Sequence, residues 1–275
     1  MPLKAGTRRA LAPEVSLFAP QENLTNSPKS AVLGAAPEGA TDAQSASRAV
    51  REMFTSIAPR YDLLNHVLSM NIDRLWWKRT AKTFATILSR PDARVLDLCC
   101  GTGDMTLALR RQAGKSSPEI LGADFSHAML QRASQKAAAT SLRWVEADAL
   151  HLPFPDAHFD LITSAFGFRN LADYDAGLQE IKRVLRPGGE FGILDFGEPR
   201  GVVGKGYRIY FKHILPAIGT FISGVKGPYA YLPASVARFP APDEMLERIS
   251  QVGFSDPSWT PYTLGIAGLY RGRKV

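Results

Sequence analysis

The sequence predicts an α/β fold built on a doubly wound parallel sheet, and three observations carry this prediction. From Arg94 onward, short apolar segments alternate with segments of helical periodicity. In "VLDLCCGTGDMTLAL", residues 95–109, a glycine turn separates an apolar run from the opening of a helix. Acidic residues close three successive apolar runs. Strands that alternate with helices indicate parallel pairing through crossover helices.

The elements of this alternation can be placed by their periodicity. We expect strands at Arg94–Leu98, Glu119–Asp124, Leu142–Glu146, Phe159–Ala165 and Glu190–Phe196. The helices expected between them cover about residues 105–112, 127–138 and 173–185. Upstream, residues 47–88 have helical patterning with a break at Ala58-Pro59, which predicts two or three helices packed against the edge of the core domain.

Composition divides the chain into a tail and one domain. Residues 1–45 are rich in Ala, Pro, Ser, Thr and Gly, and we expect a disordered tail there. An organellar transit peptide is the alternative, and the four acidic residues of this segment argue against it. We expect residues 46–275 to form the domain, with N-terminal helices over 46–90 and a helical cap insertion at about 200–240.

The two cysteines, Cys99 and Cys100, are adjacent in a chain of 275 residues. They exclude a disulfide framework, and no Cys/His spacing typical of a metal site occurs, so we expect no metal. A cytoplasmic location follows from this cysteine usage. The most apolar stretch, Ile214 to Val225, is about half the roughly 20 residues that a membrane-spanning helix needs.

The formal net charge of +7 is concentrated toward the C-terminus. No acid occurs between Pro199 and Pro242, where six basic residues interleave with aromatic and apolar ones. This pattern is typical of an amphipathic segment that touches an anionic membrane, and equally of a buried cap helix with a basic rim. Nucleic-acid binding has the weakest support, because no recognition module is present.

Three acids stand at the ends of predicted strands, where parallel sheets bind their ligands. Asp97 precedes the turn Gly101-Thr102-Gly103, and Asp124, 21 residues after Gly103, is placed to accept hydrogen bonds from ribose hydroxyls. Asp148, with the backbone N–H of Ala149, is placed to read an adenine edge. The alternative is that each acid caps the helix that follows it.

A dinucleotide fits this turn poorly. The hydride-transfer fingerprint requires a third glycine where Thr106 stands, and Asp97 would repel a pyrophosphate. A ligand with a ribose, a positive charge and no phosphate suits the acids better. S-adenosylmethionine is such a ligand.

Several motifs carry a resemblance to a known family. "VLDLCCGTGD", "LPFPDAHFD" and "EIKRVLRPGGEFGILDF" resemble motifs of class I S-adenosylmethionine-dependent methyltransferases. "MFTSIAPRYDLLNHVLSMNIDRLWWKR", "FGFRNLADYDAGLQEIKRVLRPGG", "YAYLPASVARFP" and "GIAGLYRGRK" resemble the quinone-biosynthesis C-methyltransferases, which act on demethylmenaquinone or 2-polyprenyl-6-methoxy-1,4-benzoquinol. The resemblance covers about residues 48–275. It implies a Rossmann-like fold with a mostly parallel seven-stranded sheet and helices on both faces.

The resemblance also implies a set of donor contacts. The family's contacts with S-adenosylmethionine fall on Thr102, Asp124, Asp148 and Ala149, beside the Asp97, Gly101 and Gly103 that the turn itself indicates. The family often has a serine where this chain has Ala165, so one contact falls to the backbone or to Ser164. Asp195 replaces the usual glutamate and Tyr270 the usual histidine of the terminal motif.

The acceptor that the resemblance implies is a ring carbon of a polyprenylated quinol. Arg169, in "FGFRN", is expected to stabilise the developing anion, with Asn170 orienting a hydroxyl and Tyr61 closing over the donor. An Arg169 that merely ties a loop to a carboxylate is an equal alternative. His66 is a conceivable base, although a lone histidine is more often structural, and we assign no general base.

The implied activity is that of a bacterial enzyme that methylates demethylmenaquinol to menaquinol. Methylation of the ubiquinone-pathway benzoquinol, alone or in addition, is one alternative, and a non-catalytic scaffold of a quinone-synthesis complex is another. Methylation of RNA or protein on the same fold is disfavoured by the acceptor-side signatures. The cysteine usage and the basic segment predict a cytoplasmic protein that contacts the inner face of the membrane through about 200–240, and a homodimer is left open.

Overall fold

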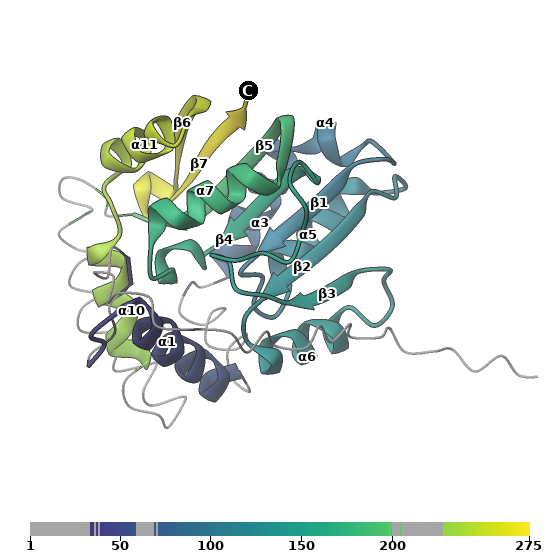
Figure 1. Ribbon diagram of the computed structural model, residues 1–275. Helices are drawn as coiled ribbons and strands as arrows, with labels where there is room; N and C mark the ends of the chain where they lie inside the picture. The colour runs from purple at the N-terminus through teal and green to yellow at the C-terminus, as the bar shows by residue number, and fades with distance from the viewer. Residues whose placement is uncertain are drawn as a thin grey trace, which may run out of the picture.

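The computed structural model describes residues 34–35, 37, 39–58, 69, 71–197, 199, 204 and 228–275. In this part of the chain seven strands form one sheet in the order β3-β2-β1-β4-β5-β7-β6 (Figure 1). The strands are β1 (Arg94–Leu98), β2 (Glu119–Asp124), β3 (Arg143–Glu146), β4 (Phe159–Ala165), β5 (Leu185–Phe196), β6 (Phe254–Tyr262) and β7 (Ala267–Lys274). The pairs among β1 to β5 are parallel, whereas β7 runs antiparallel to β5 and β6.

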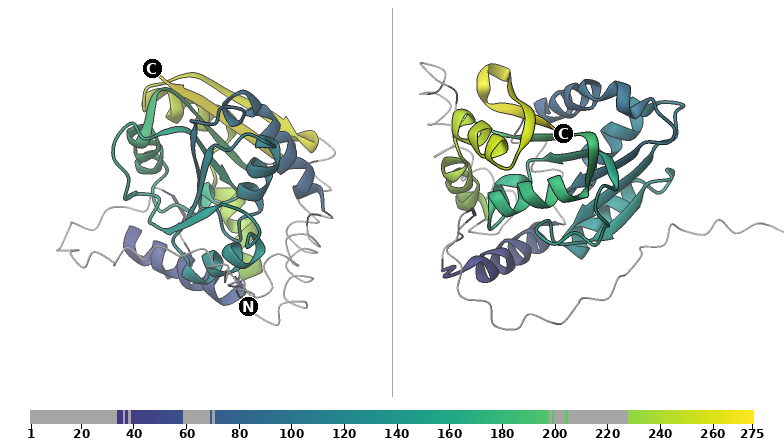
Figure 2. Two further views of the ribbon diagram at one scale, coloured as in Figure 1. Left: turned by 90° about the vertical axis from the view of Figure 1, so that its right-hand side faces the viewer. Right: turned by 45° about the horizontal axis from the view of Figure 1, so that its top comes forward.

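Helices cover both faces of the sheet, as Figures 1 and 2 show. One face packs against α3 (Ile72–Thr83), α4 (Ala85–Leu88), α5 (Asp104–Ala113) and α6 (His127–Lys136), and the other against α7 (Tyr174–Val184) and α11 (Pro242–Gln251). Each face has its own apolar cluster, because parallel strands are buried on both sides. Two further helices, α1 (Ala43–Ile57) and α10 (Pro228–Arg238), lie together beside the sheet's edge.

The strand order fixes where a ligand can bind. β1 pairs with β2 on one side and with β4 on the other, so the chain reverses its direction of winding at β1. Crevices in doubly wound sheets open beyond the carboxyl ends of the strands at this switch point. The residues that follow β1, β2, β3 and β4 therefore converge there.

The strand-helix alternation predicted from the sequence is confirmed, with β1, β2 and β4 at their expected bounds. β5 begins five residues earlier than expected, at Leu185. The antiparallel strands β6 and β7 were not located by periodicity, and they complete the seven strands that the family resemblance implied. None of the helices in the described ranges is long and apolar enough to cross a membrane.

The boundary expected for the tail was too late. α1 begins at Ala43, where the Asp42 side chain caps it by accepting from the Ser45 N–H at 2.8 Å. Further upstream, the N–H of the buried Ala35 donates to the Leu171 carbonyl at 2.7 Å. Residues 1–33, Tyr61 and most of the expected cap insertion lie outside the described residues, although α10 supplies a helix within the insertion.

Candidate active site

The turn between β1 and α5 is held in an unusual backbone conformation. Cys99, Gly101 and Gly103 have φ angles of 53°, 55° and 83°. A Cβ at Gly103 would also lie 2.6 Å from the Trp144 ring. Gly103 therefore serves the turn and the packing of β3. It is not among the described residues that line the pocket beyond the carboxyl ends of the strands, and its contact with the donor stays a prediction.

Asp97 lies fully buried at the end of β1 on the floor of the pocket. Its carboxylate accepts hydrogen bonds from Thr106 Oγ1 at 2.6 Å and from Thr163 Oγ1 at 2.8 Å. Burial raises the pKa of Asp97 to about 7, and the two threonine hydroxyls oppose that rise. Thr106, which breaks the dinucleotide fingerprint, thus holds the acid that disfavours a pyrophosphate.

Asp124 ends β2 and ties two backbone segments together. Its Oδ2 accepts from the Gly101 N–H and its Oδ1 from the Ser126 N–H, both at 2.9 Å. Burial raises the pKa of Asp124 to about 6, against the effect of these hydrogen bonds and of the positive Arg51. A carboxylate has about four acceptor positions, so two remain for a ligand.

Thr102 sits between these acids and the start of α5. It is buried and lines the pocket, and its Oγ1 accepts from Lys136 Nζ at 3.1 Å. The same ammonium donates to Asp104 at 3.0 Å. Lys136 thereby fastens the turn to the end of α6.

The segment after β3 brings Asp148, Ala149 and Leu150 to the pocket wall. The Asp148 side chain accepts from the Leu150 N–H at 2.9 Å, which folds the segment into a tight turn. Its carboxylate also lies 3.5 Å from His151 Nδ1 and remains about half exposed. Asp148 is thus the acid of the three that is open to solvent.

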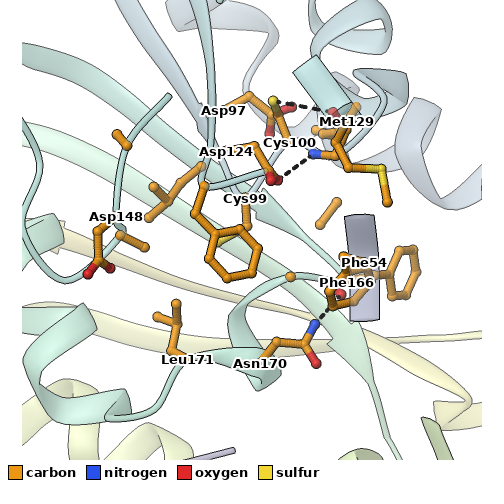
Figure 3. Close-up of a pocket in the computed structure, with 18 of the residues that line it drawn as sticks. Phe54, Asp97, Cys99, Cys100, Asp124, Met129, Asp148, Phe166, Asn170 and Leu171 are labelled. Carbon is orange, nitrogen blue, oxygen red and sulfur yellow. Dashed lines mark hydrogen bonds between the residues drawn. The ribbon is translucent and has the colours of Figure 1, made fainter. Parts of the chain in front are cut away.

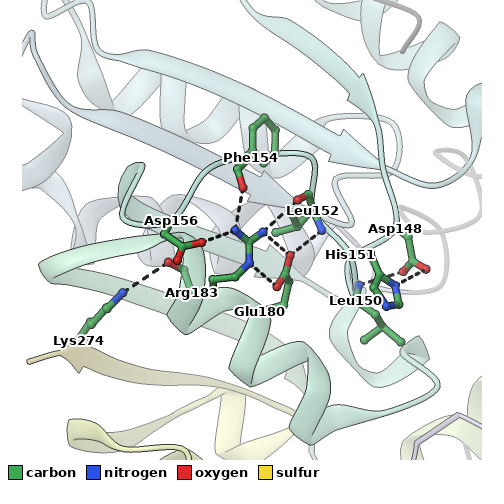
Figure 4. A network of polar contacts seen from close by, with 9 residues as sticks. All are labelled: Asp148, Leu150, His151, Leu152, Phe154, Asp156, Glu180, Arg183 and Lys274. Atoms are coloured by element: carbon green, nitrogen blue, oxygen red, sulfur yellow. Dashed lines mark hydrogen bonds and ion pairs between the residues drawn. The ribbon is translucent and has the colours of Figure 1, made fainter. Parts of the chain in front are cut away.

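A network on α7 holds this segment from behind (Figure 4). The Arg183 guanidinium donates to the carbonyls of Phe154 at 2.9 Å and Leu152 at 3.0 Å, and to Asp156 at 2.7 Å. Glu180 accepts from Arg183 and from the Leu152 N–H at 2.7 Å. The backbone of the segment after Asp148 is therefore held to α7 by hydrogen bonds that Arg183 donates to its carbonyls and that the Leu152 N–H donates to Glu180.

The opposite wall comes from the loop after β4. A Cβ at Gly167 would lie 2.3 Å from Cys99 Cβ, so only glycine allows this loop to approach the β1 turn. Asn170 lines the pocket, and its Oδ1 accepts from the Tyr231 hydroxyl of α10 at 3.1 Å. Ala165 lines the pocket as well, whereas the buried Ser164 is not among the described residues that line it, so the arrangement favours the backbone over Ser164 for the contact of the family's serine.

Arg169 occupies a place that differs from the one expected. It is not among the described residues on the pocket wall. Its guanidinium donates from Nη1 to Asp195 Oδ1 at 2.9 Å and to the Phe166 carbonyl, and its backbone N–H donates to Asp195 Oδ2 at 3.1 Å. Both members of this ion pair are buried. The arrangement matches the alternative of a tether between loop and strand, which corrects the expectation of a direct contact with the acceptor.

The pocket and the open space at its mouth together amount to about 980 Å³. Figure 3 shows Asp148 on one side and Met129 with Phe54 on the other, with Asp97 and Asp124 at the top of the view between them. The residues that line it and were missed from the sequence include Ser47, Phe54, Trp77, Phe125, Met129, Phe166 and Leu171. Phe125 follows Asp124 directly, and Phe166 is the first residue of the motif "FGFRN", so both positions carried a local signal.

Helix α1 closes one side of this pocket. Ser47 and Phe54 line it. On the same helix, Arg51 forms an ion pair with Glu146, and Thr55 Oγ1 lies 3.1 Å from Ser126 Oγ. The Ser126 backbone N–H also donates to Asp124, so Ser126 connects α1 to the carboxylate at the end of β2.

The sequence matches the profile of the ubiE/COQ5 methyltransferase family over residues 41–274. A demethylmenaquinone methyltransferase of Deinococcus radiodurans is 48% identical, over 85% of this chain and 95% of its own length. A demethylmenaquinone methyltransferase of Thermus thermophilus is also 48% identical, over 80% and 99%. A ubiquinone/menaquinone biosynthesis C-methyltransferase UbiE of Geotalea daltonii is 44% identical, over 82% and 96%.

Solved structures show the same fold at low sequence identity. An S-adenosylmethionine-dependent methyltransferase of Thermotoga maritima, described as a possible histamine N-methyltransferase, has a TM-score of 0.58 at 16% identity, over 82% of this chain and all of its own. The [4+2]-cyclase SpnF has a TM-score of 0.59 at 17% identity, over 89% and 99%. The Rossmann-like class I methyltransferase fold is therefore established for this chain, and the fold alone does not fix the reaction.

Proposed function

Because this chain belongs to the ubiE/COQ5 methyltransferase family, we propose that it transfers a methyl group from S-adenosylmethionine to a ring carbon of demethylmenaquinol. The observation that carries this proposal is one pocket in which Asp97, Asp124 and Asp148 meet Asn170 of the acceptor-side motif. Relatives named for demethylmenaquinone methylation, at 48% identity over most of both chains, support the same reaction. The chain is accordingly a methyltransferase.

The residues present fit the methyl donor. Asp124 retains acceptor positions for two ribose hydroxyls after serving Gly101 and Ser126. Asp97 supplies negative charge at the floor of the pocket, where a cationic ligand favours its ionised form. Asp148, Ala149 and Thr102 complete the donor contacts that we propose. When bound, S-adenosylmethionine supplies a methyl group activated by a positively charged sulfur.

On the acceptor side the chain must raise the nucleophilicity of the quinol ring. A phenol-like hydroxyl has a pKa of about 10, so the protein has to orient it and stabilise the anion. We assign the contact to Asn170, whose Oδ1 is already fixed by Tyr231. Arg169 then acts as a positioning residue that holds the Phe166 carbonyl beside Asn170. Tyr61 stays a prediction outside the described residues.

The ubiquinone-pathway benzoquinol is the second candidate acceptor, and relatives with the combined ubiquinone/menaquinone name favour it. The two acceptors differ by one fused ring. A non-catalytic scaffold would bind the donor without consuming it.

One experiment separates these functions. The purified protein is incubated with methyl-labelled S-adenosylmethionine, a reductant, and a short-tailed demethylmenaquinone or its benzoquinone counterpart, and the products are identified by mass. We expect a single methyl group on the naphthoquinol ring, and none without reductant. Methylation of the benzoquinol alone would overturn the assignment of the acceptor. Donor binding without transfer to either ring would support the scaffold instead.

The remaining expectations concern location. A peripheral contact with anionic membrane through about 200–240 stays a proposal, because that segment lies largely outside the described residues. A cytoplasmic location and a homodimer likewise stay proposals.

A further inference from the structure

Helix α3 has one face that is cationic and carries an exposed leucine. At 100° per residue, Arg74, Lys78, Lys82, Leu75 and Arg79 fall within one continuous arc of about 140°. All five are exposed, and Leu75 keeps 62% of its surface in contact with solvent. The acid of this helix, Asp73, is buried, so no acid belongs to the exposed arc.

A second exposed leucine stands next to this face. Leu264 of η4 (Thr263–Gly265) is 75% exposed, and its φ of 58° follows a φ of 46° at Thr263. Left-handed backbone is unfavourable for both residues, and Trp76 Nε1 stabilises it by donating to Thr263 Oγ1 at 2.8 Å. Leu75 is the chain neighbour of Trp76 and Leu264 that of Thr263, so the Trp76–Thr263 hydrogen bond brings the two exposed leucines into the same region of the surface.

The basic face of α3 reaches the strand that precedes η4. The Arg79 guanidinium lies 4.2 Å from the centre of the Tyr262 ring, which joins the basic face to the strand before η4. We call Arg74, Leu75, Lys78, Arg79, Lys82 and Leu264 the α3–η4 surface.

This surface adjoins the mouth of the pocket. Ala267, two residues after η4, pairs with Phe196 at the carboxyl end of β5, the edge where the pocket opens. In the first turns of α3, Trp77 lines the pocket and the Trp76 ring lies 5.7 Å from that of Phe166. Whatever the surface contacts is therefore brought close to the acceptor side.

We propose that the α3–η4 surface binds an anionic lipid bilayer. Lysine and arginine side chains are attracted to acidic headgroups, while leucines at their margin enter the boundary of the acyl chains. RNA fits less well, because single-stranded nucleic acid needs exposed aromatic platforms and both tryptophans of α3 are buried. The proposal rests on α3 and η4 alone and does not depend on which quinol is methylated.

The test is sedimentation of the full chain with vesicles of phosphatidylcholine alone or with added phosphatidylglycerol. We expect binding only with the anionic lipid, and weaker binding as salt increases. Lys78→Gln with Lys82→Gln should lower the partition constant about 20–30-fold, at about fivefold per charge. Leu75→Gln with Leu264→Asn should lower it about tenfold while asparagine preserves the left-handed turn.

The matched control is Arg111→Gln with Lys115→Gln, which removes the same charge from exposed positions at the far end of α5. This control should retain binding to within about twofold, the difference that general electrostatics allows. Equal losses in both charge variants would overturn the proposal, because net charge and not the surface would then drive binding. Unchanged partitioning of the leucine variant, or tighter capture of single-stranded RNA than of vesicles by the same residues, would overturn it as well.

Discussion

The Tyr231 hydroxyl donates a hydrogen bond of 3.1 Å to Asn170 Oδ1 and so joins α10 to the loop after β4. Burial raises the pKa of Tyr231 to about 12, so the hydroxyl stays protonated and remains a donor at any physiological pH. The contact fixes the amide of Asn170 with its Nδ2 directed to the Phe166 carbonyl at 3.5 Å. Two signatures that stand 61 residues apart thus form one wall of the pocket.

Removing that hydroxyl should affect the acceptor and spare the donor. In Tyr231→Phe the Asn170 amide loses its fixed orientation, and we expect the single-turnover rate to fall about tenfold, the equivalent of one neutral hydrogen bond of about 1 kcal/mol or slightly more. Donor affinity, measured by calorimetry on the same variant, should not change. A tenfold loss of donor affinity at an unchanged rate would place this pair on the donor side instead.

Asp124→Ala should lower the affinity of the protein for the methyl donor. Two ribose hydroxyls lose a charged acceptor that contributes about 1.5–3 kcal/mol. The Gly101 and Ser126 N–H groups lose their partner too, so Asp124→Asn, which keeps one acceptor oxygen, should be affected less. Calorimetric titration with S-adenosylhomocysteine measures both. Wild-type affinity in the alanine variant would remove Asp124 from the donor site.

Donor affinity should rise with pH. Without ligand, burial holds the pKa of Asp97 near 7 and that of Asp124 near 6, both above the ordinary value of 3.8. A raised carboxyl pKa stabilises the folded state fully below pH 4, and this contribution is lost as pH rises through 6 to 7. A cationic donor favours the ionised acids, so binding should tighten between about pH 5 and 8, by at most tenfold per unit and per proton.

The matched variant for this dependence is Thr163→Val. The threonine hydroxyl donates to the Asp97 carboxylate at 2.8 Å, and its loss should raise the pKa of Asp97 further. We therefore expect the midpoint of the binding curve to move to higher pH, with more proton release at pH 7 in buffers of different ionisation enthalpy, because a larger share of free Asp97 is protonated there. A midpoint that does not move would show that Asp97 does not titrate on binding.

Local patterns predicted the positions of Asp97 and Asp124 correctly. An acidic residue directly after a run of apolar residues marks the point at which a buried strand reaches the edge of the sheet. They failed at β5, where Pro187, Gly188 and Gly189 read as a turn although the chain continues as a strand. They also missed β6, because its prolines at 257 and 261 are tolerated only at the edge of a sheet. Whether a strand lies at the edge of the sheet depends on how all seven strands pair, and a short stretch of sequence does not show this.

The acceptor side was harder to predict for the same reason. Arg169 was predicted to be a functional residue, but its partner Asp195 lies 26 residues away on β5, and only the fold brings the two together. The wall formed by Ser47 and Phe54 comes from a helix before the sheet, whose periodicity indicates a buried face and not what that face covers.

Arg183 should affect donor affinity from outside the pocket. In Arg183→Met the carbonyls of Leu152 and Phe154 lose their shared donor, so the segment that carries Asp148 and Ala149 loosens. We expect donor affinity to fall about tenfold, or 1.4 kcal/mol, with little change in the rate at saturating donor. Arg186→Met is the control, because it breaks an ion pair with Asp160 at the opposite edge of the sheet. If Arg183→Met and Arg186→Met bind the donor with the same affinity, Arg183 contributes to the stability of the fold and not to the donor site.

Arg169 should control the rate through the geometry of the acceptor wall. Its guanidinium serves Asp195 and the Phe166 carbonyl at once, and a lysine ammonium cannot reproduce this planar fork. We expect Arg169→Lys to retain donor affinity and to lower the single-turnover rate on a soluble quinol analogue. Arg169→Ala should cost about 10²–10³ in rate. It should also destabilise the fold by about 3–5 kcal/mol, because Asp195 is left as an unpaired buried charge.

The loss of stability and the loss of rate can be separated by removing both charges. Arg169→Met combined with Asp195→Leu replaces the buried ion pair by apolar groups of similar size, which is often neutral for stability. If Arg169 positions the acceptor wall, this double variant should regain the melting temperature but not the rate. Donor titration on the same protein should remain normal, since the donor contacts follow β1, β2 and β3. Recovery of both stability and rate would reduce Arg169 to a tether, and normal turnover at saturation with poor donor binding would place it in the donor site.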